Sequence, residues 1–263
     1  MRMPLALIAA VLVVAPALAQ VPDTVFLEEL TWTEARDAVG AGTTTVVIPT
    51  GGTEQNGPHM VLGKHNYLVR YKAGEIAKRL GRTLVAPVMA YVPEGDVNPP
   101  TGHMRFSGTI TTPPDVFARV LEFAARSLRQ HGFRDIAFLG DSGGNQEGQR
   151  LVAEALNKEW AGTPTRVHHL SAYYPGPGDD WLKREGVSDG DVGSHASIHD
   201  TASLLFLNPS MIRRDKLAPG KAGDGSGTIG NPALATVEYG RQIVEMQIDA
   251  ALRQLRALRD APR

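Results

Sequence analysis

Short apolar and β-branched segments alternate along this chain with longer segments in which apolar residues recur at helical spacing. The short segments predict four strands, at 44–49, 83–88, 135–139 and 167–170. The longer segments predict helices at 31–39, 67–80, 113–132, 146–160 and 235–259. Strands that alternate with helices form a parallel sheet covered on both faces, so the expected fold class is α/β.

The N-terminal segment differs from the rest of the chain. Arg2 precedes an apolar run, and Ala17-Leu18-Ala19 is a small-x-small cleavage signal. The pattern predicts a secretory signal peptide at residues 1–19 and a single domain at 20–263. An uncleaved membrane anchor is the alternative, but the run is shorter than the roughly 20 residues that span a bilayer, and Pro16 interrupts it. We therefore expect a periplasmic or secreted protein without membrane contact after cleavage.

Charge and cysteine content exclude several classes of function. The 27 Lys and Arg residues nearly balance the 28 Asp and Glu residues, and no block of like charge occurs. Neither nucleic acid nor an anionic membrane surface is therefore an expected partner. Because the chain has 0 cysteines, it has no disulfide, thiolate metal site or cysteine nucleophile. Any metal ion must bind to His, carboxylate, amide or hydroxyl groups.

Three polar segments, 50–66, 140–146 and 193–203, carry the candidate site residues. In parallel α/β folds, loops at the carboxyl ends of strands line the ligand crevice. The carboxylates and imidazoles of these segments are Glu54, His59, His65, Asp141, His195, His199 and Asp200. Such groups, brought together from several loops, are typical ligands of zinc or manganese. The alternative is that they are capping or surface residues, and that 143–145 is a simple turn.

Five motifs in order resemble those of the creatininase (creatinine amidohydrolase) family. Residues 52–60 (GTEQNGPHM) resemble its G-S/T-x-E-Q-H-G-P-H-L signature, followed at 62–65 (LGKH) by its L-G-x-D segment. Residues 106–110 (FSGTI) resemble F-P-G-T-I, and 139–145 (LGDSGGN) resemble the N-G-H-G-G-N turn after a strand. Residues 195–201 resemble H-A-G-x-x-E-T-S, and 230–236 resemble G-D-P-x-x-A-T. The motifs extend over nearly the whole chain after the predicted signal peptide.

The resemblance implies a three-layer αβα domain with a mostly parallel sheet that forms a homo-oligomer, in this family usually a hexamer. It also implies a two-metal centre that hydrolyses a cyclic or linear amide C–N bond of a small-molecule substrate, with a metal-bound hydroxide as nucleophile. Carried across, the first carboxylate ligand is Glu54. The histidine that passes a proton to the leaving nitrogen is His195.

Three metal positions depart from the family pattern. Asn56, His65 and Ser142 stand where the family has a His, a bridging Asp and a His. Neutral imidazole offers one lone pair to one metal, so His65 cannot bridge two ions as an Asp does. We therefore expect one divalent ion, zinc or manganese, rather than two. The expected ligands are Glu54, His65 and Asp200, with Asp141 or His59. The alternative is a non-catalytic protein that binds a small molecule on the same scaffold.

A third hypothesis is a serine hydrolase, because residues 140–144 (GDSGG) match the G-x-S-x-G nucleophile elbow around Ser142. No His follows Asp200 in the sequence, so His195 would have to act as the base. His103 precedes the motif at 106–110 and could face the pocket, but we expect it to be a surface residue.

Overall fold

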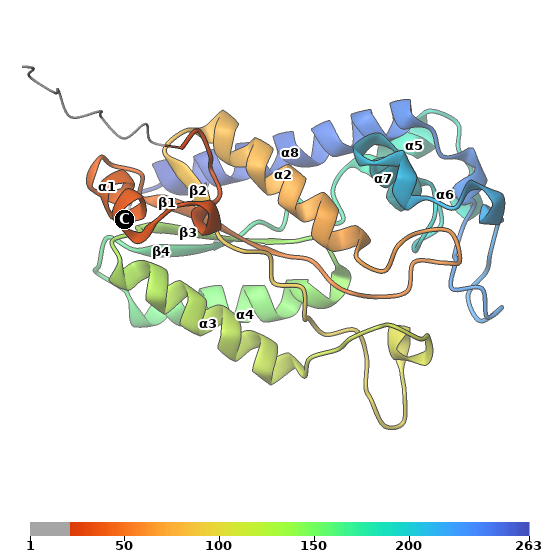
Figure 1. Cartoon of the computed structure of the whole chain (residues 1–263), viewed down its shortest axis with the longest axis horizontal. Coiled ribbons are helices and arrows are strands. Elements are labelled where there is room, and N and C mark those ends of the chain that lie inside the picture. Colours follow the sequence, from red (N-terminus) through yellow and green to blue (C-terminus); the bar gives the residue numbers. More distant parts are fainter. Residues whose placement is uncertain (1–21, 263) are drawn as a thin grey trace, which may run out of the picture.

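The computed structural model describes residues 22–262 (Figure 1). The predicted signal peptide at 1–19 lies outside these residues. Four parallel strands form one sheet in the order β2-β1-β3-β4. They are β1 (Thr45–Thr50), β2 (Thr83–Val85), β3 (Asp135–Gly140) and β4 (Arg166–His169). Each predicted strand is present, and the all-parallel pairing confirms the expected fold class.

Two helices cover each face of the sheet (Figure 1). They are α2 (Lys64–Leu80) and α8 (Val237–Asp260) on one face, and α3 (Pro114–Gln130) and α4 (Gly143–Glu159) on the other. One hydrophobic cluster fills each interface. Because helices cover both faces, every residue of β1 and β3 is buried, which explains their largely apolar sequence. The three-layer αβα arrangement is thereby confirmed.

Three helices beyond the carboxyl ends of the strands were not predicted (Figure 1). They are α5 (Gly178–Arg184), α6 (Asp189–Val192) and α7 (Ile198–Leu207). The polar segment expected at 193–203 therefore ends inside a helix, and its Thr201 and Ser203 are buried. α7 packs closely on α8, where Gly240 has no side chain to collide with the Ala202 carbonyl.

The remaining helical elements of the described chain are shorter or lie away from the site. They are α1 (Trp32–Gly40) and 3-10 segments at Leu27–Glu29, Gly102–Arg105, Pro209–Met211, Arg214–Lys216 and Pro232–Leu234. Within residues 22–262, no helix combines the length and the hydropathy of a membrane span.

Asn145, in the first turn of α4, fixes the end of β1 to the end of β3. Its Nδ2 lies 3.1 Å from the Thr50 carbonyl oxygen, 2.9 Å from that of Gly51 and 2.8 Å from Thr50 Oγ1. Gln149, one turn later, donates to the same Thr50 hydroxyl at 2.8 Å. Residues 143–145 are therefore a structural joint at the start of a helix, which excludes the alternative of a simple turn.

Candidate functional site

The three predicted polar segments meet around one cavity of about 1000 Å³. Glu54 to His65 reach it from the end of β1, Ser142 to Gly144 from the end of β3, and 192–200 from the chain that leads into α7. Three further segments, 93–106, 174–179 and 221–229, complete the walls. The site thus lies at the carboxyl edge of the sheet, as the general rule for parallel α/β folds predicts.

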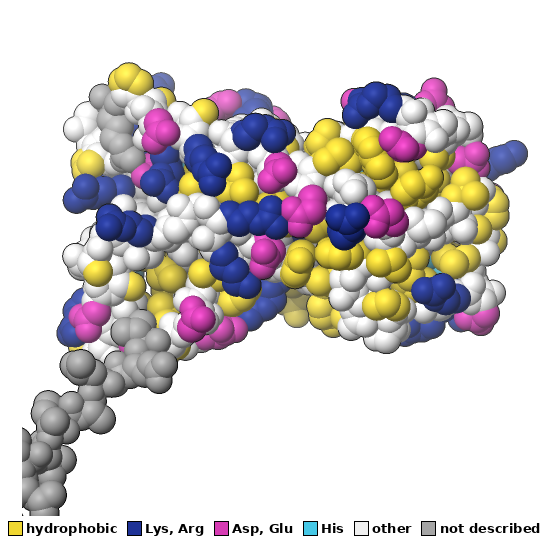
Figure 2. All heavy atoms as spheres, turned by 90° about the horizontal axis from the view of Figure 1, so that it is seen from above, with side chains coloured by type: hydrophobic (Ala, Val, Ile, Leu, Met, Phe, Trp, Pro, Cys, Tyr) yellow, Lys and Arg dark blue, Asp and Glu magenta, His cyan; other side chains and the backbone are white. Residues whose placement is uncertain are grey.

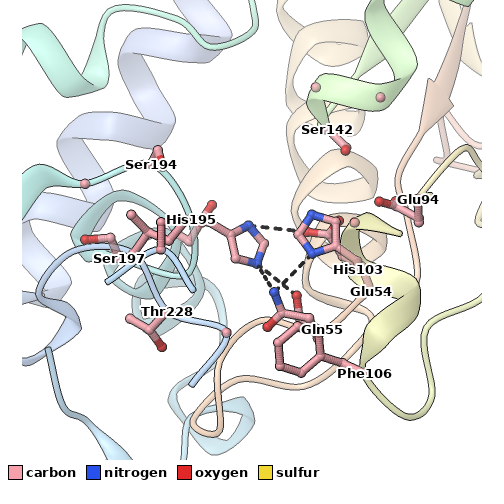
Figure 3. A pocket seen from close by; sticks show the side chains of 18 of the residues that line it. Glu54, Gln55, Glu94, His103, Phe106, Ser142, Ser194, His195, Ser197 and Thr228 are labelled. Carbon is pink, nitrogen blue, oxygen red and sulfur yellow. Dashed lines mark hydrogen bonds and ion pairs between the residues drawn. The ribbon is translucent and has the colours of Figure 1, made fainter. Parts of the chain in front are cut away.

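Glu54 lies among three imidazoles in this cavity, of which Figure 3 shows those of His103 and His195. The residue is 1% exposed, and its Oε1 lies 2.9 Å from His65 Nε2. His103 Nε2 is 3.3 Å from Glu54 Oε2, and His195 Nδ1 is 3.8 Å from Glu54 Oε1. Burial disfavours the carboxylate, but the charges of His65 and Lys64 outweigh it, so the pKa of Glu54 lies well below its usual range. Glu54 is therefore ionised.

Gln55 orients two of these imidazoles (Figure 3). Its Oε1 accepts a hydrogen bond from the Gly57 N–H at 2.9 Å, which turns Nε2 towards His103 Nδ1 at 3.0 Å and His195 Nε2 at 2.9 Å. His195 Nε2 also lies 3.0 Å from the Gln55 carbonyl oxygen. The other nitrogen of each ring therefore faces Glu54. These nitrogens are His103 Nε2 and His195 Nδ1.

His65 has carboxylates at both ring nitrogens. Its Nδ1 is 2.9 Å from Asp141 Oδ2, opposite the Glu54 contact. Burial opposes a charged ring, but Glu54 and Asp141 outweigh it and raise the pKa of His65. With both nitrogens donating to carboxylates, His65 has no lone pair for a cation.

Asp141 is in turn held by two buried side chains behind the cavity. Lys72 Nζ lies 3.2 Å from Asp141 Oδ1, and the Tyr173 hydroxyl donates to the same oxygen. Burial raises the pKa of Asp141, but Lys72 and His65 lower it to about 2. We call His65, Asp141, Lys72 and Tyr173 the Asp141 network.

Asp200 is engaged at both oxygens. Its Oδ1 lies 3.0 Å from the Nζ of Lys64, which is 1% exposed, and its Oδ2 accepts the Ala196 N–H at 2.8 Å. Ala196 has a φ of 49°, a left-handed conformation that is uncommon outside glycine. The Asp200 carboxylate thus holds the strained backbone that follows His195.

His59 does not line the cavity. It is fully buried, and its Nε2 lies 3.0 Å from the Thr201 hydroxyl of α7. Burial lowers the pKa of His59 to about 4, so the ring is neutral at pH 7. Its contact with α7 makes His59 part of the joint between the first and third polar segments.

Two cavity residues were missed by the sequence analysis. His103, expected at the surface, faces Glu54, and the one signal for it was its place just before the motif at 106–110. Glu94 is buried beside Glu54, and burial together with the Glu54 charge raises the pKa of Glu94 to about 10. Glu54 Oε2 and Glu94 Oε1 are both buried without a hydrogen-bond partner.

The residues facing Glu54 fit a single cation. Glu54, His103 and His195 each offer one ligand atom, and these atoms lie within 4.8 Å of one another. One carboxylate and two imidazoles form a donor set suited to zinc or manganese, and Glu54 Oε2, which has the His103 contact but no hydrogen bond, is an oxygen that a cation would satisfy. Binding of a cation at His103 Nε2 places the ring proton on Nδ1, so Gln55 Nε2 does not donate to that ring while the cation is bound. The predicted ligands His65, Asp141, Asp200 and His59 lie outside this group and have the partners described above.

Taken together, the parallel sheet and the carboxylate–imidazole cluster at its carboxyl edge define an α/β protein with a candidate cation site. The family model for creatininase, described as creatinine amidohydrolase, matches residues 28–255. The chain therefore belongs to the creatininase family.

Curated relatives include two with different activities. Creatinine amidohydrolase of Pseudomonas putida is 24% identical over 202 residues, which cover 74% of this chain and 76% of the relative. The mycofactocin precursor peptide peptidase of Mycobacterium tuberculosis (strain ATCC 25618 / H37Rv) is 26% identical over 242 residues, which cover 80% of this chain and 84% of the relative.

Solved creatininase structures share the fold. A creatininase mutant superposes with a TM-score of 0.76 at 22% identity, over 90% of this chain and 100% of that one. A structure described as creatininase with Mn gives a TM-score of 0.72, also at 22% identity and with the same coverage.

Proposed function

We propose that this protein is a metal-dependent hydrolase of amide C–N bonds and that the reaction takes place at Glu54, His103 and His195. The observation that carries the proposal is the convergence of these three ligand atoms on a cavity of the creatininase fold. A divalent cation held there would act as a Lewis acid and make a water molecule nucleophilic near neutral pH. A cavity of about 1000 Å³ accommodates a small molecule or a short peptide segment.

The residues around the three ligands keep them in place. Gln55 holds the His103 and His195 rings, and Asp141 holds His65 against Glu54. Such outer contacts fix ring orientation and affect both metal affinity and activity. The substrate class we infer is an amide, because one relative is named for creatinine and another for a peptide.

His195 has one nitrogen for two possible tasks. Its Nδ1, the atom directed at Glu54, can bind a cation or accept a proton, but not both at once. We assign it the ligand role in the tautomer whose Nε2 carries the proton and donates to the Gln55 carbonyl oxygen. In that tautomer Nε2 accepts no hydrogen bond from the Gln55 amide, and the Nδ1 lone pair is free. A His195→Gln variant should then lose cation affinity. Retained affinity with lost turnover would instead indicate the proton transfer predicted from the sequence.

The two alternative functions find less support in the geometry. Ser142 Oγ makes no hydrogen bond to an imidazole among the described residues, so the serine hydrolase lacks its nucleophile–base pair. A non-catalytic binding protein would use the same cavity, and it is distinguished by the absence of turnover.

The direct test combines metal analysis with hydrolysis. Protein purified without chelator should contain about one equivalent of zinc or manganese and hydrolyse members of a panel of N-acyl amino acids, short peptides and cyclic amides. Glu54→Gln should abolish both properties, because it removes the central anionic ligand. Glu75→Gln, the same change on α2 beside Lys78, is the matched control and should change neither. A metal-free wild type without turnover would refute the proposal.

We also propose that the protein acts outside the cytoplasm as a homo-oligomer. The support is the signal-peptide pattern at residues 1–19 and the resemblance to an oligomeric family. N-terminal sequencing of the secreted protein should begin at Gln20, and light scattering should give a multiple of the chain mass.

A further inference from the structure

Ser142 occupies the N-cap position of α4 without capping the helix. Its backbone is extended, as N-cap residues are, but its side chain accepts no hydrogen bond from the first turn. The residue is 5% exposed and lines the cavity, and its hydroxyl points into it (Figure 3). The hydroxyl has no partner within residues 22–262. Because this hydroxyl has no protein partner and opens on the cavity, it is available to a ligand.

The first N–H groups of α4 are free at the same place. Gly143 and Gly144 line the cavity, and neither N–H has an acceptor in the described part of the chain. The start of a 17-residue helix also carries a partial positive charge from the aligned peptide dipoles. Together these features favour an acceptor with negative charge.

Tyr174 adds a fourth donor. Its hydroxyl oxygen lies 3.8 Å from the point where a Cβ on Gly143 would be, and Tyr174 lines the cavity. This hydroxyl likewise has no hydrogen-bond partner among the described residues. Burial and the nearby Asp200 charge raise the pKa of Tyr174, so the hydroxyl keeps its proton and can donate. We call Ser142, Gly143, Gly144 and Tyr174 the donor corner.

The number of donors indicates the kind of acceptor. The donor corner offers four donors, and a carboxylate has about four lone-pair sites on two oxygens, whereas a carbonyl has two on one. A dianion such as phosphate is less suitable, because the cavity lining has no large excess of positive charge. The cations of Lys64, Arg105 and Lys221 are offset by the carboxylates of Glu54, Asp179, Asp200 and Asp224. A single negative charge satisfies the donors with the least repulsion from these groups.

We propose that the donor corner binds a carboxylate group of the substrate. The amide that is hydrolysed would then carry a free carboxylate, as an N-acyl amino acid or the C-terminal residue of a short peptide does. That this carboxylate belongs to a substrate rests on the proposed function, but its binding can be measured without turnover.

The test compares two ligands that differ only in the acid group, N-acetylglycine and N-acetylglycinamide, by calorimetry on the intact protein. The acid should bind at least about tenfold more tightly than the amide. Ser142→Asp should weaken binding of the acid by more than about tenfold, because it places a negative charge in the donor corner. Asp is a favourable N-cap, so this variant is expected to fold.

The matched control is Ser194→Asp, which adds the same charge to an exposed serine elsewhere in the cavity wall (Figure 3). It should change binding of the acid by less than about threefold. Tyr174→Phe, which removes one hydroxyl, should weaken the acid and leave the amide unchanged.

Three results would overturn the inference: equal binding of acid and amide, no measurable binding of the acid, or full binding by Ser142→Asp. Binding that persists in Ser142→Asp but disappears with a chelator would mean that the cation holds the carboxylate, which also overturns it. An inactive protein that prefers the acid would support this inference and refute the proposed hydrolysis. An active enzyme that prefers neutral amides would do the reverse.

Discussion

Asp141 and Ser142 are consecutive in the chain, yet they belong to opposite kinds of polar structure. Both Asp141 oxygens are occupied, by His65, Lys72 and Tyr173. The Ser142 hydroxyl and the two N–H groups after it have no acceptor among the described residues. The Asp141 network is complete and holds the shape of the site, whereas the donor corner is incomplete and leaves its hydrogen bonds to a ligand. The comparison teaches that burial alone does not identify a binding residue, but an unsatisfied donor beside a cavity does.

The largest effect is expected on removing the centre of the Asp141 network. Asp141→Ala leaves Lys72 and His65 buried without their shared counter-ion, and breaking a buried pair in this way costs about 3–5 kcal/mol. The free energy of unfolding, measured by urea denaturation, should fall by that amount.

A double variant separates charge from packing at this position. Lys72→Met with Asp141→Leu removes both charges and keeps the volume, so it should be more stable than Asp141→Ala alone. A loss below about 1 kcal/mol for Asp141→Ala would contradict the idea that this network supports the site.

The next largest effect is expected at the candidate cation site. His103→Ala removes one of three atoms that face a bound cation, so the affinity for zinc should fall by about a hundredfold in a chelator competition assay. His169→Ala is the control, since His169 Nε2 bonds to Gln146 Oε1 at 2.9 Å and does not line the cavity. A greater loss with Asp200→Ala than with His103→Ala would favour the ligand set predicted from the sequence.

Much of the fold is predictable because a sheet covered on both faces imposes a simple pattern. β1 and β3 are short apolar runs, and the helices that cover them have apolar residues on one side. α7 escaped prediction because its first turns carry polar residues such as Thr201 and Ser203, which are buried by contact with other loops and helices. Tertiary packing, not periodicity, makes that segment a helix.

The site was predictable where it follows a strand and unpredictable where it does not. Glu54 and His65 follow β1, so their meeting at the sheet edge could be expected. His103 and Glu94 lie in the long segment after β2, where the one regular element is a 3-10 turn. The partners of each imidazole are set by side chains distant in sequence, such as Asp141 for His65, so sequence could name the chemical groups but not their pairing.

His59 is intermediate between the complete Asp141 network and the incomplete donor corner. One of its ring nitrogens is hydrogen-bonded, and the other, Nδ1, is buried without a partner. Its pKa is lowered from 6.5 to about 4 because burial disfavours the charged ring. His59 is protonated near pH 6.5 in the unfolded chain but only near pH 4 in the folded chain. Stability is therefore fully present above pH 6.5 and decreases as the pH falls towards 4.

The pH effect can be isolated at His59 because burial is the largest cause of its lowered pKa, ahead of the charges of Asp200 and Lys64. Urea midpoints of the wild type should be lower at about pH 4.5 than at about pH 7.5, and His59→Gln should reduce this difference. Part of the difference should remain, since the pKa of His195 is also lowered to about 4 by burial. An unchanged difference in His59→Gln would show that His59 is not a source of acid sensitivity.

The smallest effect is expected for an ion pair that, unlike those of the Asp141 network, is exposed to water. Arg79 on α2 bonds to both carboxylate oxygens of Glu245 on α8, at 2.7 and 2.9 Å, in an exposed position. This side of the molecule carries interspersed charges of both signs (Figure 2). Water and salt screen such pairs, so Glu245→Gln should lower the free energy of unfolding by at most about 1 kcal/mol, and by almost nothing in about 1 M NaCl. A salt-independent loss above about 2 kcal/mol would contradict this prediction. The exposed pair and the buried Lys72–Asp141 pair would then contribute similarly to stability, so burial would not explain the larger effect expected for Asp141→Ala.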